Sequence, residues 1–326
     1  MLAMRIAPFV GSAVLALIVG VPSAAPAWAA GPVLTAGGTA IPGPMAAGTA
    51  LPGPASVAAT ASVAAGPATR VAADPPAVAA RVAYVIDSAG TVHFGKRATA
   101  RVPVASLVKV MTAYVVLRQA ELDDMITITA ADVRHAARNG AATASLRAGE
   151  RLTVRDLLYG LMLPSGADAA NVLARVYGPG KTAFIRRMNA TARSLGLSDT
   201  RYTNADGLPT PSAGGYSTAV DQAELTRRAL TDPVFRTIVA RQTHTVPKTG
   251  SHRAHTWRNT NKLLTRTDGV LGVKTGYTRA AGFCLLFAGE RGGRQVVGVL
   301  LNDQDERRFR TAERLLDYVD GQLAFG

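Results

Sequence analysis

The sequence predicts an α+β fold, in which helices flank an antiparallel sheet and a helical subdomain lies between strands from both ends of the folded part. Apolar, strand-like runs occur between residues 81 and 98 and again between 270 and 301, and a long region of helical spacing separates them. The turns within each group of strands are short and rich in glycine. Strands joined by short turns pair antiparallel, and segregated strands and helices are typical of α+β domains.

The first 30 residues carry the pattern of a secretory signal peptide. Arg5 precedes an uncharged apolar run from Ile6 to Val21, and Ala27–Ala29 reads Ala-Trp-Ala, a small-residue cleavage site. The alternative is a retained membrane anchor, although the run is slightly shorter than the roughly 18 to 20 residues that span a bilayer. Both interpretations predict an exported protein that is secreted or held at the cell wall.

Residues 31–78 are predicted to form a flexible linker. No charged residue occurs from Gly31 to Thr69, where alanine, glycine and proline dominate. Such a composition cannot bury enough apolar surface to offset its chain entropy. The predicted organisation is therefore a signal segment (1–30), a linker (31–78) and one folded domain (79–326).

The elements of the folded domain follow from local patterns. The turn Asp87–Gly90 joins the first two strands, and a helix is predicted from Ser106 to Arg118. Residues 153–178 are helical with a break at Pro164 and Gly166. Further helices are expected over 181–197, over 217–235 with Ser217 as a candidate cap, and over 305–323, with three strands over 270–301.

The single cysteine and the net charge limit the functional classes. Cys284 excludes an internal disulfide, and its apolar surroundings predict a buried, inert thiol rather than a nucleophile. The net charge of +14 attracts polyanions. Because export argues against nucleic acid as a partner, an anionic cell wall or membrane surface is favoured, with a merely solubilising surface charge as the alternative.

Ser106 and Lys109 form the first candidate for chemistry. Their spacing places both side chains on one face of a helix. A serine hydroxyl becomes a good nucleophile when a base removes its proton, and burial lowers the pKa of a lysine so that it can act as that base. Taken alone, the pair also fits a capping serine and an exposed surface lysine.

Two other stretches add to this pair. In VKTGYT, Lys274 and Thr275 provide a cation and a hydroxyl for a substrate carboxylate, and Gly276 lets an extended peptide approach the strand edge. In LPSGADAA, Ser165 lies at a break between helices, where a hydroxyl can relay a proton. Taken separately, VKTGYT also fits a simple turn, and Ser165 also fits a helix cap.

In this order, the three stretches resemble the motif set of the penicillin-recognising serine enzymes. More narrowly, ASLVKVMTAYVVL, LMLPSGADAANVLA, YSTAVDQAEL and GVKTGYTRAAGFCLLFAG resemble the D-alanyl-D-alanine carboxypeptidase family of low-molecular-weight penicillin-binding proteins. The resemblance covers about residues 80 to 320 and implies a β-lactamase/DD-peptidase-like fold. It also implies a peptidoglycan stem peptide ending in D-Ala-D-Ala as substrate, β-lactam antibiotics as covalent inhibitors, and no metal or organic cofactor.

The resemblance implies a role for each matching residue. Ser106 would be the acylated nucleophile, Lys109 its general base and Ser165 a proton relay to the leaving amine. Lys274 and Thr275 would hold the substrate carboxylate, and Lys274 would also help to keep Lys109 neutral. The residues after this pair are Gly276 and Tyr277, and the backbone N–H groups of Tyr277 and Ser106 would form the oxyanion hole.

One position departs from the family pattern. The second motif usually ends in asparagine, and Ala167 stands there instead, which puts the orientation of the substrate amide in doubt. The alternative is that Asn171, which is nearby in the sequence, replaces it, although an exposed helical asparagine is the commoner case. No glutamate occurs between Glu150 and Glu224, which disfavours a serine β-lactamase with a glutamate-held water. A low-turnover penicillin sensor or wall-binding protein is the other alternative.

Overall fold

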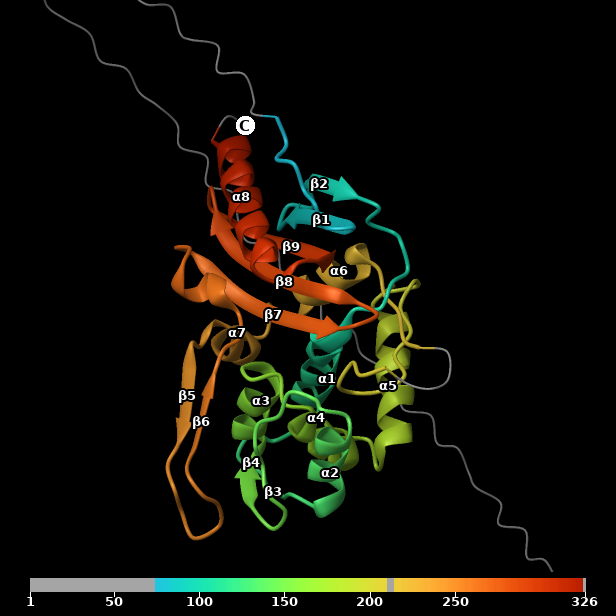
Figure 1. Cartoon of the computed structure of the whole chain (residues 1–326), viewed down its shortest axis with the longest axis vertical. Coiled ribbons are helices and arrows are strands. Elements are labelled where there is room, and N and C mark those ends of the chain that lie inside the picture. The colour runs from blue at the N-terminus through green and yellow to red at the C-terminus, as the bar shows by residue number, and fades with distance from the viewer. Residues whose placement is uncertain (1–73, 210–213, 325–326) are drawn as a thin grey trace, which may run out of the picture. The chain divides into compact units, whose positions relative to one another are not determined.

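An antiparallel sheet built from both ends of the chain organises the fold. The computed structural model describes residues 74–209 and 214–324, so the predicted signal segment and most of the linker lie outside the described residues. The strand order is β2-β1-β9-β8-β7 (Figure 1). The strands are β1 (Val82–Asp87), β2 (Val92–Lys96), β7 (Val270–Thr278), β8 (Gly282–Arg291) and β9 (Arg294–Asp303). The predicted α+β class is confirmed.

Both faces of this sheet are covered, which explains why its strands read as continuous apolar runs. On β9, Val297 and Val299 join the core shared with the helical part, while Leu300 joins a second core under helix α8 (Asp305–Leu323). Gly298 is required between them, because a Cβ there would lie 2.0 Å from the Phe287 ring. Successive side chains of a strand point to opposite faces, so one strand supports both cores.

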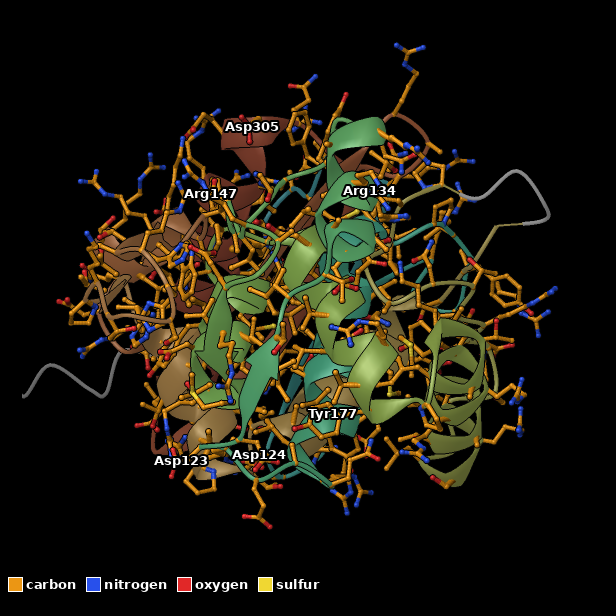
Figure 2. All side chains as sticks on the ribbon, turned by 90° about the horizontal axis from the view of Figure 1, so that it is seen from below. Asp123, Asp124, Arg134, Arg147, Tyr177 and Asp305 are labelled. Carbon is orange, nitrogen blue, oxygen red and sulfur yellow. The ribbon has the colours of Figure 1, made fainter. Side chains whose placement is uncertain are left out.

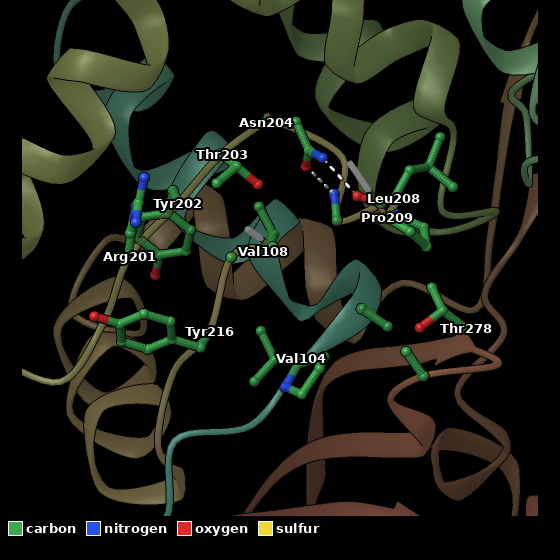
Figure 3. A pocket seen from close by; sticks show the side chains of 16 residues that line it. Val104, Val108, Arg201, Tyr202, Thr203, Asn204, Leu208, Pro209, Tyr216 and Thr278 are labelled. Atoms are coloured by element: carbon green, nitrogen blue, oxygen red, sulfur yellow. Dashed lines mark hydrogen bonds between the residues drawn. The ribbon is translucent and has the colours of Figure 1, made fainter. Parts of the chain in front are cut away.

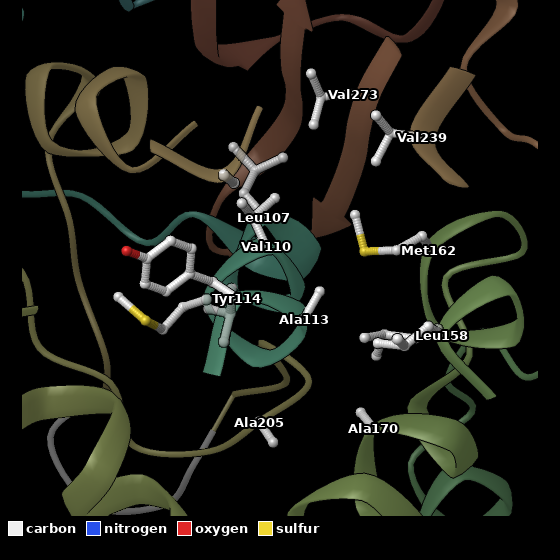
Figure 4. Close-up of a cluster of buried hydrophobic side chains, with 14 of the residues drawn as sticks. Leu107, Val110, Ala113, Tyr114, Leu158, Met162, Ala170, Ala205, Val239 and Val273 are labelled. Carbon is white, nitrogen blue, oxygen red and sulfur yellow. The ribbon is translucent and has the colours of Figure 1, made fainter. Parts of the chain in front are cut away.

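The helical part surrounds one buried helix. Helix α1 (Val108–Leu117) contacts α3 (Val154–Met162), α4 (Ala167–Tyr177), α5 (Lys181–Ser194) and α6 (Ala219–Ala229). Every residue from Val108 to Val116 is buried, and Figure 4 shows Leu107, Val110 and Ala113 among side chains from the neighbouring elements. Each fully buried aliphatic side chain stabilises the fold by about 1.5 to 3 kcal/mol, so α1 holds its first turn firmly.

Helix starts are specified by threonine and aspartate caps. The Thr153 hydroxyl accepts from Asp156 N at the start of α3. At α6 the cap is Thr218, and not Ser217 as predicted, because the Thr218 hydroxyl accepts from Asp221 N. The single helix predicted over 217–235 is also wrong, since Asp232 caps a separate helix α7 (Pro233–Ala240). Because each capping residue begins its own helix, this stretch contains residues of two helices rather than one.

Several short elements were not predicted. They are helix α2 (Ala130–Arg138) and the hairpins β3–β4 (Met125–Thr127, Arg151–Thr153) and β5–β6 (Thr243–Val246, His255–Arg258). Strands of three or four residues are too short to show a clear period of two. Figure 2 shows charged side chains at the periphery of the helical end, including Asp123, Arg134 and Arg147.

Candidate active site

A cleft opens where β7 meets the first turn of α1. It encloses about 480 Å³ and is bounded by three further segments: the loop after α2, the junction of α3 and α4, and the turn at Leu208. Its lining includes Ser106, Lys109, Ser165, Thr275, Gly276 and Tyr277. Lys274, the remaining residue that the motifs predicted, lies on the same strand as Thr275. The fold thus brings the three sequence stretches together.

Ser106 lies in a short 3₁₀ helix, η1 (Ala105–Leu107), that leads directly into α1. The Lys109 Nζ atom lies 2.9 Å from Ser106 Oγ and donates to the Asp206 carbonyl oxygen at 2.7 Å. Ser106 makes no capping bond to the helix, and Lys109 is 2% exposed. The capping serine and the exposed lysine are therefore both excluded.

Burial sets the protonation of Lys109. It lowers the pKa of the amine from 10.5 to about 8, against the opposing effect of the Asp206 and Asp168 carboxylates. With a pKa of about 8, roughly a tenth of the amine is neutral at pH 7. At 2.9 Å from Ser106 Oγ, a neutral Lys109 amine is within hydrogen-bond distance of the hydroxyl proton.

Ser165 adopts an uncommon backbone conformation at the cleft. Its φ is 66°, and its hydroxyl is buried without a hydrogen-bond partner among the described residues. The N-cap of α4 is Gly166, so Ser165 is not the helix cap. Non-glycine residues with positive φ cost about 1 to 3 kcal/mol and concentrate at functional sites. An unpaired hydroxyl held in this way is ready to bind a substrate group.

Lys274 and Thr275 lie within β7 rather than in a turn. Lys274 is 1% exposed, and burial lowers its pKa well below the usual value, with the Lys109 charge as the next cause. The two amines repel each other when both are charged, so each favours the neutral form of the other, whereas the Asp206 and Asp168 carboxylates act in the opposite direction on Lys109. The Thr275 hydroxyl is 2.6 Å from that of Thr260, which fixes it at the cleft.

Gly276 is needed for close contact between β7 and η1. A Cβ at this position would lie 3.1 Å from Ser106 N and 3.2 Å from the Val104 carbonyl oxygen. The backbone of Ser106 is thus held against the strand that carries Tyr277, whose side chain is 57% exposed. This places the two backbone segments that the resemblance assigns to the oxyanion hole side by side.

Sequence reasoning missed Arg308, which also lines the cleft. Its guanidinium donates to the carbonyl oxygens of Gly276 and Cys284, each at 3.2 Å, and its Nε has no partner among the described residues. The side chain comes from α8, far along the chain from the three motifs, and only its 7% exposure distinguishes it from the many surface arginines. Its guanidinium also pairs with Asp305 of the same helix at 2.8 Å, so the cleft wall carries a cation that is held in place.

Asn171 does not replace the asparagine that is missing at position 167. Its Nδ2 donates to the Ala167 carbonyl oxygen at 2.6 Å, its side chain is buried, and Asn171 is not among the cleft-lining residues. Ala167 itself lines the cleft. The amide function is therefore absent at this point of the wall.

Cys284 is fully buried on β8, and burial raises the pKa of its thiol to about 11. A protonated, inaccessible thiol is a poor nucleophile, as the sequence predicted.

An apolar pocket of about 300 Å³ adjoins the cleft (Figure 3). Leu208, Pro209 and Thr278 line both spaces, so the Leu208–Pro209 segment forms a partition between them. Figure 3 shows the Asn204 side chain bracing this segment, accepting from Gly207 N at 2.7 Å and donating to the Leu208 carbonyl oxygen at 2.6 Å. These two hydrogen bonds stabilise the loop that forms the cleft wall beside Ser106.

Comparisons with known proteins agree with this geometry. A D-alanyl-D-alanine carboxypeptidase from Streptomyces sp. strain K15 is 40% identical over 274 residues, which cover 80% of this chain and 93% of the relative. The D-alanyl-D-alanine carboxypeptidase DacB2 of Mycobacterium tuberculosis is 36% identical over 208 residues, 64% of this chain and 69% of the relative. The crystal structure of the Streptomyces K15 DD-transpeptidase superposes with a TM-score of 0.72 and 40% identity, covering 76% of this chain and 98% of that one. Because residues 69–305 also match the profile of peptidase family S11, D-alanyl-D-alanine carboxypeptidase, the chain belongs to that family.

Proposed function

We propose that this protein is a serine-type carboxypeptidase that removes the terminal D-alanine from peptidoglycan stem peptides through an acyl-enzyme on Ser106. The observation that carries the proposal is the contact of 2.9 Å between Lys109 Nζ and Ser106 Oγ, made by an amine whose pKa is lowered to about 8. A buried base in contact with a serine hydroxyl is the arrangement that acyl transfer needs.

The steps follow from this contact. Neutral Lys109 takes the Ser106 proton while Oγ bonds to the carbonyl carbon of the penultimate D-alanine. The resulting oxyanion is stabilised by the N–H groups of Ser106 and Tyr277. The C–N bond then breaks as the amine of the terminal D-alanine receives a proton from Lys109 through the Ser165 hydroxyl. Water, with Lys109 again as base, hydrolyses the ester and restores Ser106.

Thr275 and Arg308 would hold the carboxylate of the departing residue. Both line the cleft, and the Arg308 guanidinium is held in place by Asp305 Oδ1 at 2.8 Å and by the Gly276 carbonyl oxygen at 3.2 Å. Hydrogen bonds to charged groups contribute about 1.5 to 3 kcal/mol each, so these two residues would select peptides with a free carboxyl end. The buried Lys274 amine donates to the Thr275 carbonyl oxygen at 2.9 Å and so holds this part of β7 in place.

The same site would bind β-lactams and release them slowly. The described residues that line the cleft include no aspartate or glutamate. A carboxylate that activates water is what one large class of serine β-lactamases uses for rapid deacylation. The penicilloyl ester of Ser106 should therefore persist, which favours a carboxypeptidase over a β-lactamase.

The protein would act outside the cytoplasm, on the cell wall. Among the residues that the structure describes, no helix is both long and apolar enough to cross a bilayer. The predicted signal segment and the net charge of +14 support export and contact with an anionic surface.

The experiment separates an enzyme from a penicillin sensor. Purified protein is incubated with a fluorescent penicillin, and the labelled site is mapped by mass spectrometry. D-Alanine release from a muropeptide ending in D-Ala-D-Ala is measured in parallel, with and without an added amine acceptor. Label on Ser106 together with D-alanine release, both lost in Ser106→Ala, supports the proposal, whereas label without D-alanine release contradicts it.

A further inference from the structure

A hydrogen-bonded histidine–aspartate pair lies directly behind the catalytic base, outside the three motifs. His135 Nε2 is 2.8 Å from Asp206 Oδ2, and the Asp206 side chain is 2% exposed. His135 lies on α2, whereas Asp206 lies in the loop after α5. His135 and Lys109 hold the pKa of Asp206 below its usual value, which outweighs the opposing effect of burial. The carboxylate is therefore ionised, and His135 donates.

Asp206 touches the base and the cleft wall at once. Its carbonyl oxygen accepts from Lys109 Nζ at 2.7 Å, and its Oδ1 accepts from Leu208 N at 3.0 Å. The next residue, Gly207, has a φ of 82°, and a Cβ there would lie 2.0 Å from the Ala105 carbonyl oxygen. The loop therefore packs directly on the backbone that precedes Ser106, and Asp206 fixes its shape.

His135 connects this loop to the opposite wall. The carbonyl oxygen of His135 accepts from Asn139 Nδ2 at 2.8 Å, and Asn139 and the residues up to Ala142 line the cleft. Ala142 in turn accepts from Ala167 N at 2.9 Å, beside Ser165. The His135–Asp206 pair therefore bridges the two walls of the cleft behind Lys109.

The geometry points to His135 and Asp206 as positioning residues for Lys109: the pair fixes the carbonyl that orients the amine, and its carboxylate stabilises the proton that the amine receives from Ser106. This inference rests on the proposed function. The nucleophile Ser106 and the base Lys109 would then be oriented by two further residues, Asp206 and His135. Without the Asp206 carboxylate, Lys109 would be a weaker base, whereas a base works best with a pKa near the operating pH.

Other charged groups near the His135–Asp206 pair lie on α4, β7 and α2. Asp168, on α4, also acts on Lys109, but four bonds hold its carboxylate, from the hydroxyl of Thr143 and the N–H groups of Ala144, Leu146 and Ala169. On β7, Lys274 is the neighbouring amine. On α2 itself, Asp132 is paired with Arg175 of α4. Asp206 is thus the residue that contacts both groups, since its backbone carbonyl accepts from Lys109 and its carboxylate accepts from His135.

The test measures acylation of Ser106 by a fluorescent penicillin across about pH 6 to 9. Asp206→Asn keeps the shape but removes the charge. We expect the midpoint of the rising limb to move to lower pH and the plateau rate to fall about threefold to tenfold, because Lys109 becomes a weaker base. A purely structural role would lower the rate equally at every pH, and an unmoved midpoint overturns the inference.

His135 provides a second, independent arm that survives if Asp206→Asn does not fold. His135→Ala should lower the plateau rate about tenfold, and His135→Gln, which keeps a donor near the Nε2 position, should recover most of it. The matched control is His244→Ala, since His244 Nε2 lies 2.8 Å from Asp156 Oδ1, away from the cleft. Melting temperatures are recorded for all variants.

The outcomes separate the two proposals. If His244→Ala slows acylation as much as His135→Ala, or if Gln does not rescue, the pair has no positioning role. If the wild-type protein is not labelled at Ser106 at all, the proposed function itself fails. Unchanged labelling of His135→Ala, with wild-type labelling intact, overturns only the inference about the pair.

Discussion

Replacing Lys109 by methionine is expected to abolish acylation and yet to stabilise the fold at neutral pH. The buried amine has a pKa of about 8, against an ordinary value of 10.5. This difference corresponds to about 3 kcal/mol of unfavourable free energy when the folded protein carries the ammonium. Methionine has a similar shape and carries no charge, so it removes this term.

Part of the gain is lost again, because the substitution breaks a hydrogen bond. The Asp206 carbonyl oxygen, which accepts from Lys109 at 2.7 Å, would be left buried without that donor. An unsatisfied buried acceptor costs about 1 to 3 kcal/mol. The net effect at pH 7 is therefore a stabilisation of up to about 2 kcal/mol, or up to several degrees in melting temperature for a domain of this size.

The pH dependence of the stability difference separates the effect of the Lys109 charge from the effect of packing. Because the folded pKa lies below the unfolded pKa, the unfavourable term is fully present below about pH 8 and disappears as the pH rises towards 10.5. The advantage of Lys109→Met should therefore shrink by about 2 kcal/mol between pH 7 and about pH 9.5. Denaturant unfolding at both pH values measures this difference directly.

A matched control is Lys248→Met, which removes an exposed lysine charge and should change the free energy of unfolding by less than about 0.5 kcal/mol at both pH values. The reasoning is refuted if Lys109→Met destabilises the protein at pH 7, or if its effect is the same at both pH values. Either result would mean that Lys109 is not a desolvated amine in the folded enzyme.

Three further predictions concern the cleft and the sheet. Gly276→Ala should reduce acylation at least about tenfold while the protein still folds, because the new Cβ would lie 3.1 Å from Ser106 N. Penicillin labelling measures the acylation rate and circular dichroism checks the fold. Labelling at the wild-type rate would contradict this prediction. Ala167→Asn should raise the rate of D-alanine release up to about tenfold by returning an amide to the cleft wall, and a rate equal to wild type would show that the amide is not needed here. Cys284 should react with iodoacetamide only after unfolding, since it is fully buried and its pKa is about 11; modification of the native protein would contradict this.

The sheet and the long helices were predictable because their patterns are strong. Continuous apolar runs separated by glycine turns fixed three of the strands, and helical spacing with a proline break located α3 and α4. The hairpin of β5 and β6 could not be recognised, since its four-residue strands contain histidine, threonine and arginine. The cap at Thr218 rather than Ser217 shows that adjacent candidates are separated only by backbone geometry.

The motifs predicted the residues of the cleft but not the interactions that control them. Lys109 and Ser106 were paired by spacing alone, whereas the carbonyl of Asp206 is 97 positions away along the chain and carries no local signal. Arg308 is one of 36 lysines and arginines, and only its burial in the folded protein distinguishes it from the others as a candidate site residue. Long-range contacts of single side chains depend on tertiary packing, which periodicity and motif spacing do not encode.

The active site concentrates features that oppose folding, and this concentration is itself an argument for its function. Ser165 has a positive φ and a buried hydroxyl that finds no partner among the residues the structure describes, and two amines, Lys109 and Lys274, are buried close enough to repel each other. The strained backbone and the unsatisfied hydroxyl of Ser165 are each unfavourable by about 1 to 3 kcal/mol, yet the segments that carry these groups are anchored in the main apolar core. Sequences retain local conflicts of this kind where activity requires them. Substitutions that relieve them, such as Lys109→Met, should therefore raise stability and remove activity together, whereas equally conservative changes elsewhere in the core should lower stability.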